Sequence, residues 1–150
     1  MAELEISADE AKELLKMDKV STAEDPVELP DLGGRADMPF ASTDSREEFC
    51  ISFTRSSIML EKRNHHLRGR KVIGLARLDL DGPGHRNPDG EEIGPRHLHV
   101  YREGYGLKYA IEVPQGLFRN LDDPLVTLED FFRYCHVVTP PKIKKSLFTQ

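Results

Sequence analysis

Apolar and polar residues alternate along several short segments between residues 49 and 113, and this alternation constrains the fold more than any other feature of the chain. It is the pattern of strands that bury one face. The connecting segments are short and rich in turn residues, with no room for a helical crossover, so neighbouring strands must run antiparallel. We predict five strands, at residues 49–55, 57–63, 71–81, 96–101 and 107–113.

Helices are predicted on either side of this sheet. Ser7 and Glu10 have the spacing of a capping box, and an apolar stripe follows them, which predicts a helix over residues 8–18. Thr127 and Asp130 repeat the spacing before an aromatic stripe, which predicts a second helix over 127–136. The expected fold class is α+β: an antiparallel five-stranded sheet with an N-terminal and a C-terminal helix packed on it. We expect a core containing Phe49, Ile51, Phe53, Leu78, Leu80, Leu98, Val100, Phe131 and Phe132.

Charge divides the chain unevenly. Residues 1–48 carry fourteen acidic residues against five basic ones, whereas residues 49–110 carry seven against eleven and hold five of the six histidines. Residues 20–48 are rich in proline, glycine and aspartate, which predicts an irregular segment. We therefore divide the chain into an acidic helix and flexible arm (1–48) and a single α+β domain (49–150). The basic middle suggests RNA or another polyanion as a ligand, and the acidic arm a protein partner.

The cellular setting is predicted from what the sequence contains. Its apolar runs are all shorter than the roughly 18 residues of a membrane span, and Met1–Ser7 is acidic, unlike a signal peptide. The cysteines, Cys50 and Cys135, are interpreted as free thiols in a reducing compartment. We expect a cytoplasmic protein without a membrane partner.

Two of the predicted strands carry ionisable residues opposite their leucines. Residues two apart in a strand share a face, and if the leucine faces of two antiparallel strands share one core, their polar faces must coincide. The segment between the two strands contains Asn87-Pro88-Asp89-Gly90, a turn sequence that allows this arrangement. The predicted cluster consists of Arg77, Asp79, Asp81, His97, His99 and Tyr101, with His85 reaching over from the connecting segment.

Such a cluster suits proton transfer and stabilisation of an anion. The favoured hypothesis is metal-independent, ribonuclease-like cleavage of phosphodiesters, with His97 and His99 as the proton-transfer pair and no cofactor. Tyr101, Arg77, Asp79 and His85 are the other expected catalytic residues. We expect substrate contacts from Arg55, Arg68, Arg77 and Asn87.

Two alternatives stay open. His97, His99 and Glu103 have the HxHxxxE order of cupin metal ligands, although the later cupin motif does not follow, and imidazole with carboxylate suits zinc, iron or manganese. The other alternative is a non-enzymatic interaction or inhibitor protein that acts through its acidic arm. Loss of metal on substitution of His97 would favour the first alternative, and loss of activity on removal of the arm would favour the second.

The blocks RLDLDG (77–82), HRNPDG (85–90) and HLHVYREGYG (97–106) resemble those of a family of small uncharacterised proteins from bacteria and their mobile elements. The resemblance covers roughly residues 49–113 and implies no particular activity. It places the ionisable residues of the cluster in one pattern, together with Asn87 and Asp89. The layout of a helix before an antiparallel sheet is separately similar to that of small microbial ribonucleases and ribonuclease toxins, which is why the expected phosphodiesterase is of toxin type.

Overall fold

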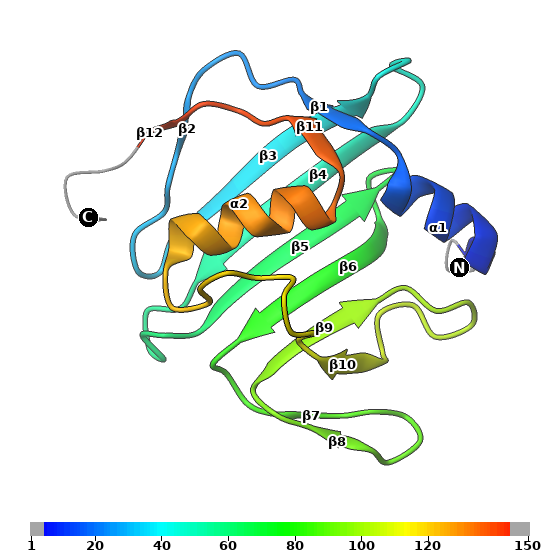
Figure 1. Cartoon of the computed structure of the whole chain (residues 1–150), viewed down its shortest axis with the longest axis vertical. Coiled ribbons are helices and arrows are strands. Elements are labelled where there is room, and N and C mark those ends of the chain that lie inside the picture. Colours follow the sequence, from blue (N-terminus) through cyan, green and yellow to red (C-terminus); the bar gives the residue numbers. More distant parts are fainter. Residues whose placement is uncertain (1–4, 145–150) are drawn as a thin grey trace.

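The structure is a computed structural model that describes residues 5–144, and it consists of one large twisted sheet with two helices (Figure 1). The helices are α1 (Ala8–Lys16) and α2 (Pro124–Tyr134). In order across the sheet the strands are β10 (Ala110–Glu112), β9 (Arg96–Val100), β6 (Ile73–Leu80), β5 (Arg63–Gly69), β4 (Glu48–Arg55), β3 (Arg35–Ser42), β1 (Lys19–Ser21) and β11 (Val137–Thr139). Two short pairs lie outside it: β2 (Val27–Glu28) with β12 (Ile143–Lys144), and β7 (His85–Arg86) with β8 (Glu92–Ile93).

The sheet is antiparallel except at one edge, where β1 and β11 run parallel. The predicted α+β class is therefore confirmed, but the prediction of five strands is wrong because the sheet has eight. The predicted pairing of 71–81 with 96–101 is confirmed by β6 and β9. Within residues 5–144, neither helix combines the length and the apolar character needed to cross a bilayer.

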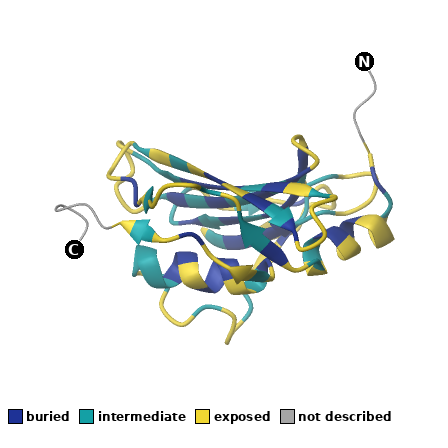
Figure 2. Cartoon of the chain, turned by 90° about the horizontal axis from the view of Figure 1, so that it is seen from above, coloured by how far each residue is buried: buried dark blue, intermediate teal, exposed yellow. Residues whose placement is uncertain are grey.

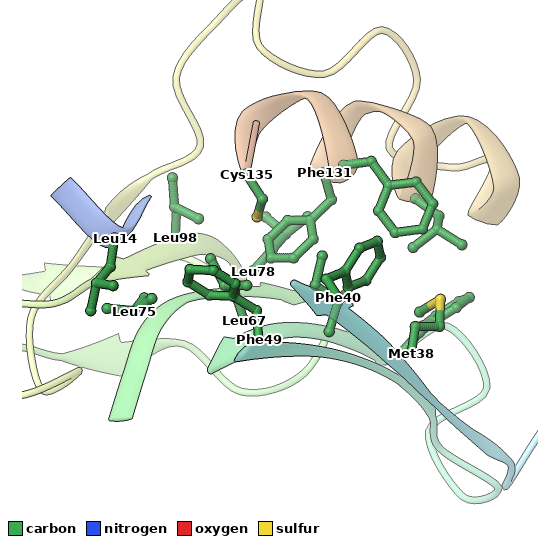
Figure 3. Packing of buried hydrophobic residues seen from close by; sticks show 14 of the residues in the cluster. Leu14, Met38, Phe40, Phe49, Leu67, Leu75, Leu78, Leu98, Phe131 and Cys135 are labelled. Atoms are coloured by element: carbon green, nitrogen blue, oxygen red, sulfur yellow. The ribbon is translucent and has the colours of Figure 1, made fainter. Parts of the chain in front are cut away.

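Both helices lie on the same face of the sheet, as Figure 2 shows from the side. Phe131 and Cys135 of the α2 region point towards the sheet, and Leu14 reaches it from α1 (Figure 3). Of the nine core residues predicted from the sequence, eight are buried, and Val100 is partly buried against the same core. We call this the core face and the opposite side of the sheet the polar face.

The helix starts follow local hydrogen bonding. Ser7 caps α1 as predicted, because its hydroxyl accepts a hydrogen bond from the Glu10 amide at 3.1 Å. The second helix begins earlier than predicted, since Asp123 is its cap and accepts from the amides of Leu125 and Val126. Thr127 is instead inside the helix, where its hydroxyl donates to the Asp123 carbonyl.

The predicted strand at 57–63 is wrong. The hydroxyl of Ser56 accepts hydrogen bonds from the amides of Ile58 and Met59, so the chain turns there instead of extending. The strand starts only at Arg63, and it continues through the two adjacent histidines to Gly69.

The predicted flexible arm is also corrected, because residues 35–42 form β3 in the interior of the sheet. Met38 and Phe40 are buried there, and β3 pairs with β4 over seven residues. The proposed boundary after residue 48 therefore separates two paired strands. Pro39 is tolerated because it lies just beyond the three residues of β3 that pair with β1.

Candidate functional site

Strand register brings the predicted polar residues together on the polar face. In the β6–β9 pair, Asp79 lies opposite His97 and Arg77 lies opposite His99, while Leu78 and Leu98 oppose each other on the core face. Both histidines are nearly inaccessible, with exposed fractions of 3% and 1%. The cluster of Arg77, Asp79, His97 and His99 is called the histidine–aspartate cluster below.

Backbone carbonyls fix the orientation of both imidazoles. The Nδ1 atom of His97 lies 2.7 Å from the Gly94 carbonyl oxygen, and that of His99 lies 2.6 Å from the Leu107 carbonyl oxygen. A carbonyl can only accept, so each Nδ1 carries the proton and donates it. In the neutral form of either ring, the Nε2 atom is then a free electron-pair donor.

Both Nε2 atoms face one carboxylate. The Oδ2 atom of Asp79 is 3.3 Å from His97 Nε2 and 3.2 Å from His99 Nε2, and these three side chains have the arrangement of a metal-binding group. Arg77 stands beside them, with its Nε donating to Asp79 at 2.9 Å and its Nη2 3.2 Å from His99 Nε2. Burial opposes ionisation of Asp79, but hydrogen bonds from His99 and Arg77 outweigh it and lower the pKa to about 2.

His85 joins the cluster from the β7–β8 hairpin. Its ring centroid lies 4.6 Å from that of His99 and 5.6 Å from that of His97. Its Nε2 donates to the Lys108 carbonyl at 2.8 Å. The hairpin turn is the predicted one, since the Gly90 amide donates to the Asn87 carbonyl and Gly90 has the positive φ that favours glycine.

His66 extends the polar face and is a site residue that the sequence analysis does not predict. It lies opposite Arg77 on one side and Ser52 on the other. Burial, with the nearby charges of Arg68 and Arg77, lowers the pKa of His66 to about 4, so the ring is neutral near pH 7. The alternation of β5 identifies it, because His66 is in phase with Arg68 whereas His65 is in phase with Leu67.

The structure places three residues that were predicted for the site elsewhere. Asp81 accepts a hydrogen bond from Arg96 Nε at 2.9 Å. The Tyr101 hydroxyl donates to the Ile6 carbonyl at 2.8 Å, which ties β9 to the segment before α1. Glu103 accepts a hydrogen bond from the Ala8 amide at 2.7 Å, at the start of α1. In the two-histidine, one-carboxylate arrangement, the carboxylate is therefore Asp79 and not Glu103.

The predicted substrate-binding residues are also separated. Asn87 is buried and exchanges two hydrogen bonds with the backbone of Ala110, which fixes the hairpin to β10. Arg55 is in phase with Phe53, on the core face, and donates to the Pro30 carbonyl. Of these residues only Arg68 and Arg77 lie on the polar face, and Arg68 donates to Ser52 at 3.3 Å.

Comparison with known proteins gives one match. Residues 6–137 match a family described as a Family of unknown function (DUF6978). No curated protein and no solved structure matches the chain. The match spans α1, the whole β3–β10 region and α2, so it includes every residue of the histidine–aspartate cluster.

Proposed function

The chain belongs to DUF6978, a family of unknown function, and we propose from the geometry of its own cluster that Asp79, His97 and His99 bind a divalent transition-metal ion for hydrolysis of phosphate esters. The proposal replaces Glu103 of the sequence hypothesis by Asp79. It also gives Arg77 a role beside the metal ion and not as a ligand.

One observation carries the proposal: the Nε2 atoms of His97 and His99 both face one carboxylate oxygen, Asp79 Oδ2, at 3.3 and 3.2 Å. A cation bound between these three atoms would be held by all of them. With metal–ligand bonds of about 2.0–2.2 Å, ligand atoms in a tetrahedral site lie about 3.3–3.6 Å apart, close to the observed separations. Carbonyl acceptors on both Nδ1 atoms are the usual outer-shell partners of metal-binding histidines.

Three protein ligands would leave a coordination position for water, and a divalent metal ion held there would activate that water for attack on phosphorus. Arg77 would supply positive charge to the phosphorus oxygens during the attack. His85, which packs against both ligand rings, would give a proton to the leaving oxygen as its bond to phosphorus breaks.

A second candidate is the metal-independent phosphodiesterase predicted from the sequence. The contacts of Arg77 favour it, because this guanidinium already supplies a cation between Asp79 and His99. His97 and His99 would then transfer protons while Arg77 binds the phosphate. The two candidates require the same residues but differ in their need for a metal ion.

Metal titration and RNA cleavage separate the candidates. We expect wild-type protein stripped of metal to bind about one equivalent of Zn²⁺ or Mn²⁺ in calorimetry. Loss of an outer-shell partner typically weakens metal affinity about 10–100-fold. Asp79 and His97 are proposed as direct ligands, so Asp79→Asn and His97→Ala should each weaken metal affinity by more than about 100-fold. Asp89→Asn makes the same chemical change at an exposed residue of the hairpin turn and should leave binding unchanged.

Cleavage of single-stranded RNA is then followed with metal and with EDTA. Activity that requires metal and disappears in Asp79→Asn supports the metal centre. Activity that persists in EDTA and disappears in His97→Ala supports the metal-independent candidate. Absence of metal binding by the folded wild-type protein would rule out the metal centre.

A further inference from the structure

A second polar group lies on the same face, three strands away from His99. The hydroxyl of Ser52 in β4 is its centre and is almost fully buried, with an exposed fraction of 3% for the residue. Ser52 donates to Asp37 Oδ1 at 2.5 Å and accepts from Arg35 Nη2 and Arg68 Nη1, each at 3.3 Å. Two guanidinium groups from different strands therefore converge on one hydroxyl. We call Arg35, Asp37, Ser52 and Arg68 the arginine pair site.

The charges of the arginine pair site do not cancel. Asp37 pairs with Arg35 through an Nε–Oδ1 distance of 2.9 Å. Hydrogen bonding from Ser52, with a smaller contribution from Arg35, lowers the pKa of Asp37, which keeps it ionised. No ion pair found within residues 5–144 involves Arg68, and the only side-chain hydrogen bond of Arg68 found there is the one to Ser52. The positive charge of Arg68 is thus not neutralised, and it lies beside the guanidinium of Arg35. A bound anion would relieve the repulsion between these two guanidinium groups.

The arginine pair site and the histidine–aspartate cluster lie on one line across the sheet. Ser52 is opposite His66, His66 is opposite Arg77, and Arg77 is opposite His99. Three strand spacings of about 4.8 Å separate the two ends of this line, or about 14 Å. A single phosphate cannot reach both ends, whereas a chain of a few linked phosphates can.

The surface between the two ends is suited to such a chain. His66 is neutral near pH 7, and its buried Nε2 has no hydrogen-bond partner. Next to it Gly74 has no side chain, and a Cβ atom there would come within 3.1 Å of that nitrogen and 2.6 Å of Leu107 Cδ1. Along the line itself, from Ser52 to His99, the residues are neutral or basic.

We propose that Arg35 and Arg68 bind a backbone phosphate of an extended phosphodiester chain, single-stranded RNA or DNA, whose reacting phosphate lies at the histidine–aspartate cluster. This inference rests on the proposed function, because it assigns the substrate class of the same site. Cations that follow the backbone without reading bases are the usual means of binding single strands. The chain would cross β4, β5, β6 and β9 along the line from Ser52 to His99.

Fluorescence polarisation with labelled oligonucleotides tests the proposal. The probes are ten-nucleotide oligouridylate and oligothymidylate and the corresponding dinucleotides, each titrated in EDTA and at several salt concentrations. We expect Arg68→Gln to weaken decamer binding about tenfold and to reduce the salt slope by about one, with little effect on the dinucleotides. Arg35→Gln, at a more exposed position, should act in the same direction. Arg46→Gln, in the exposed 43–46 turn, is the matched control.

The outcomes separate this inference from the metal centre. Metal titration of Arg68→Gln should match that of the wild type, whereas Asp79→Asn should lose metal binding. If Arg68→Gln and Arg46→Gln bind the decamer equally well, or if the dinucleotides lose as much affinity as the decamer, the arginine pair site is not a phosphate subsite. Tighter binding of the oligouridylate or of the oligothymidylate decamer shows whether the site prefers RNA or DNA. Metal binding without any oligonucleotide binding would overturn the inference while leaving the metal centre intact.

Discussion

His65 is a fully buried histidine whose two ring nitrogens have no hydrogen-bond partner. Its ring stacks on Phe53 with a centroid distance of 4.5 Å and lies 5.6 Å from that of Phe131, so it fills space like an aromatic residue between the sheet and α2. Burial, followed by the charge of Arg63, lowers the pKa of His65 to about 3. The residue is therefore neutral in the folded protein and must stay neutral for the core to remain intact.

This burial predicts acid sensitivity. In the unfolded chain His65 takes up a proton near its ordinary pKa of 6.5, while in the folded chain it does so only near 3. Because the folded pKa is depressed, neutral His65 contributes fully to the free energy of unfolding above pH 6.5. This contribution is lost as the pH falls towards 3, at up to about 1.4 kcal/mol per pH unit. The free energy of unfolding of wild type minus that of His65→Leu, measured in urea, should fall as the pH is lowered from about 7 to about 4. A constant difference would contradict the prediction.

At the scale of single residues, the sequence predicts the histidine–aspartate cluster but not every residue that surrounds it. Alternation alone predicts that Arg77, Asp79, His97 and His99 share a face, because a period of two is fixed by backbone geometry. The same alternation places Arg55 with Phe53 on the core face, so the pattern itself contradicts the prediction that Arg55 contacts a substrate. The hydrogen bonds of Tyr101 and Glu103 to residues 6 and 8 could not be predicted, since they depend on where α1 packs.

At the scale of elements, β3 shows how a strand can be hidden in a polar sequence. Arg35, Asp37 and Pro39 occupy its exposed positions, and turn-forming residues precede it, so composition indicates a loop. Buried Met38, Phe40 and Ser42 nevertheless alternate with them. The acidic arm that was expected to bind a protein partner is therefore in part a strand of the sheet, and an arm deletion would remove sheet structure as well as charge.

Truncation of a single side chain in β3 should reveal this. Phe40 is buried against α2, with its ring centroid 5.8 Å from that of Phe132. Phe40→Ala should lower the free energy of unfolding by about 3–5 kcal/mol, because it removes a buried aromatic ring and leaves a cavity. Leu32→Ala, at a residue that is 47% exposed, should change it by less than about 0.5 kcal/mol. Equal, small effects in urea unfolding would mean that β3 is not an integral strand.

At the scale of the whole molecule, the proposed metal ion and the fold are thermodynamically linked. The ligands come from β6 and β9 in the sheet, and the unfolded chain does not hold them together. A ligand at about 100 times its Kd stabilises the folded state by about 2.7 kcal/mol. For a domain of this size that corresponds to a rise in Tm of about 5–10 °C.

Differential scanning fluorimetry measures this rise directly. We expect it for wild-type protein with Zn²⁺ or Mn²⁺, reversed by EDTA and absent in Asp79→Asn. The Asp89→Asn control should retain it. A rise of equal size in Asp79→Asn would mean that the stabilising metal binds at a different place.

The pairing of β1 with β11 has a consequence for biosynthesis. Lys19 of β1 is fully buried, and its Nζ donates to the carbonyls of Leu15, Met17 and Cys135. The third of these carbonyls and the strand that covers β1 are both made more than a hundred residues after Lys19. Until residues 135–139 have emerged from the ribosome, β1 therefore has an unpaired edge and the ammonium group of Lys19 stays hydrated. During this time the edge of β1 is exposed to pairing with other chains.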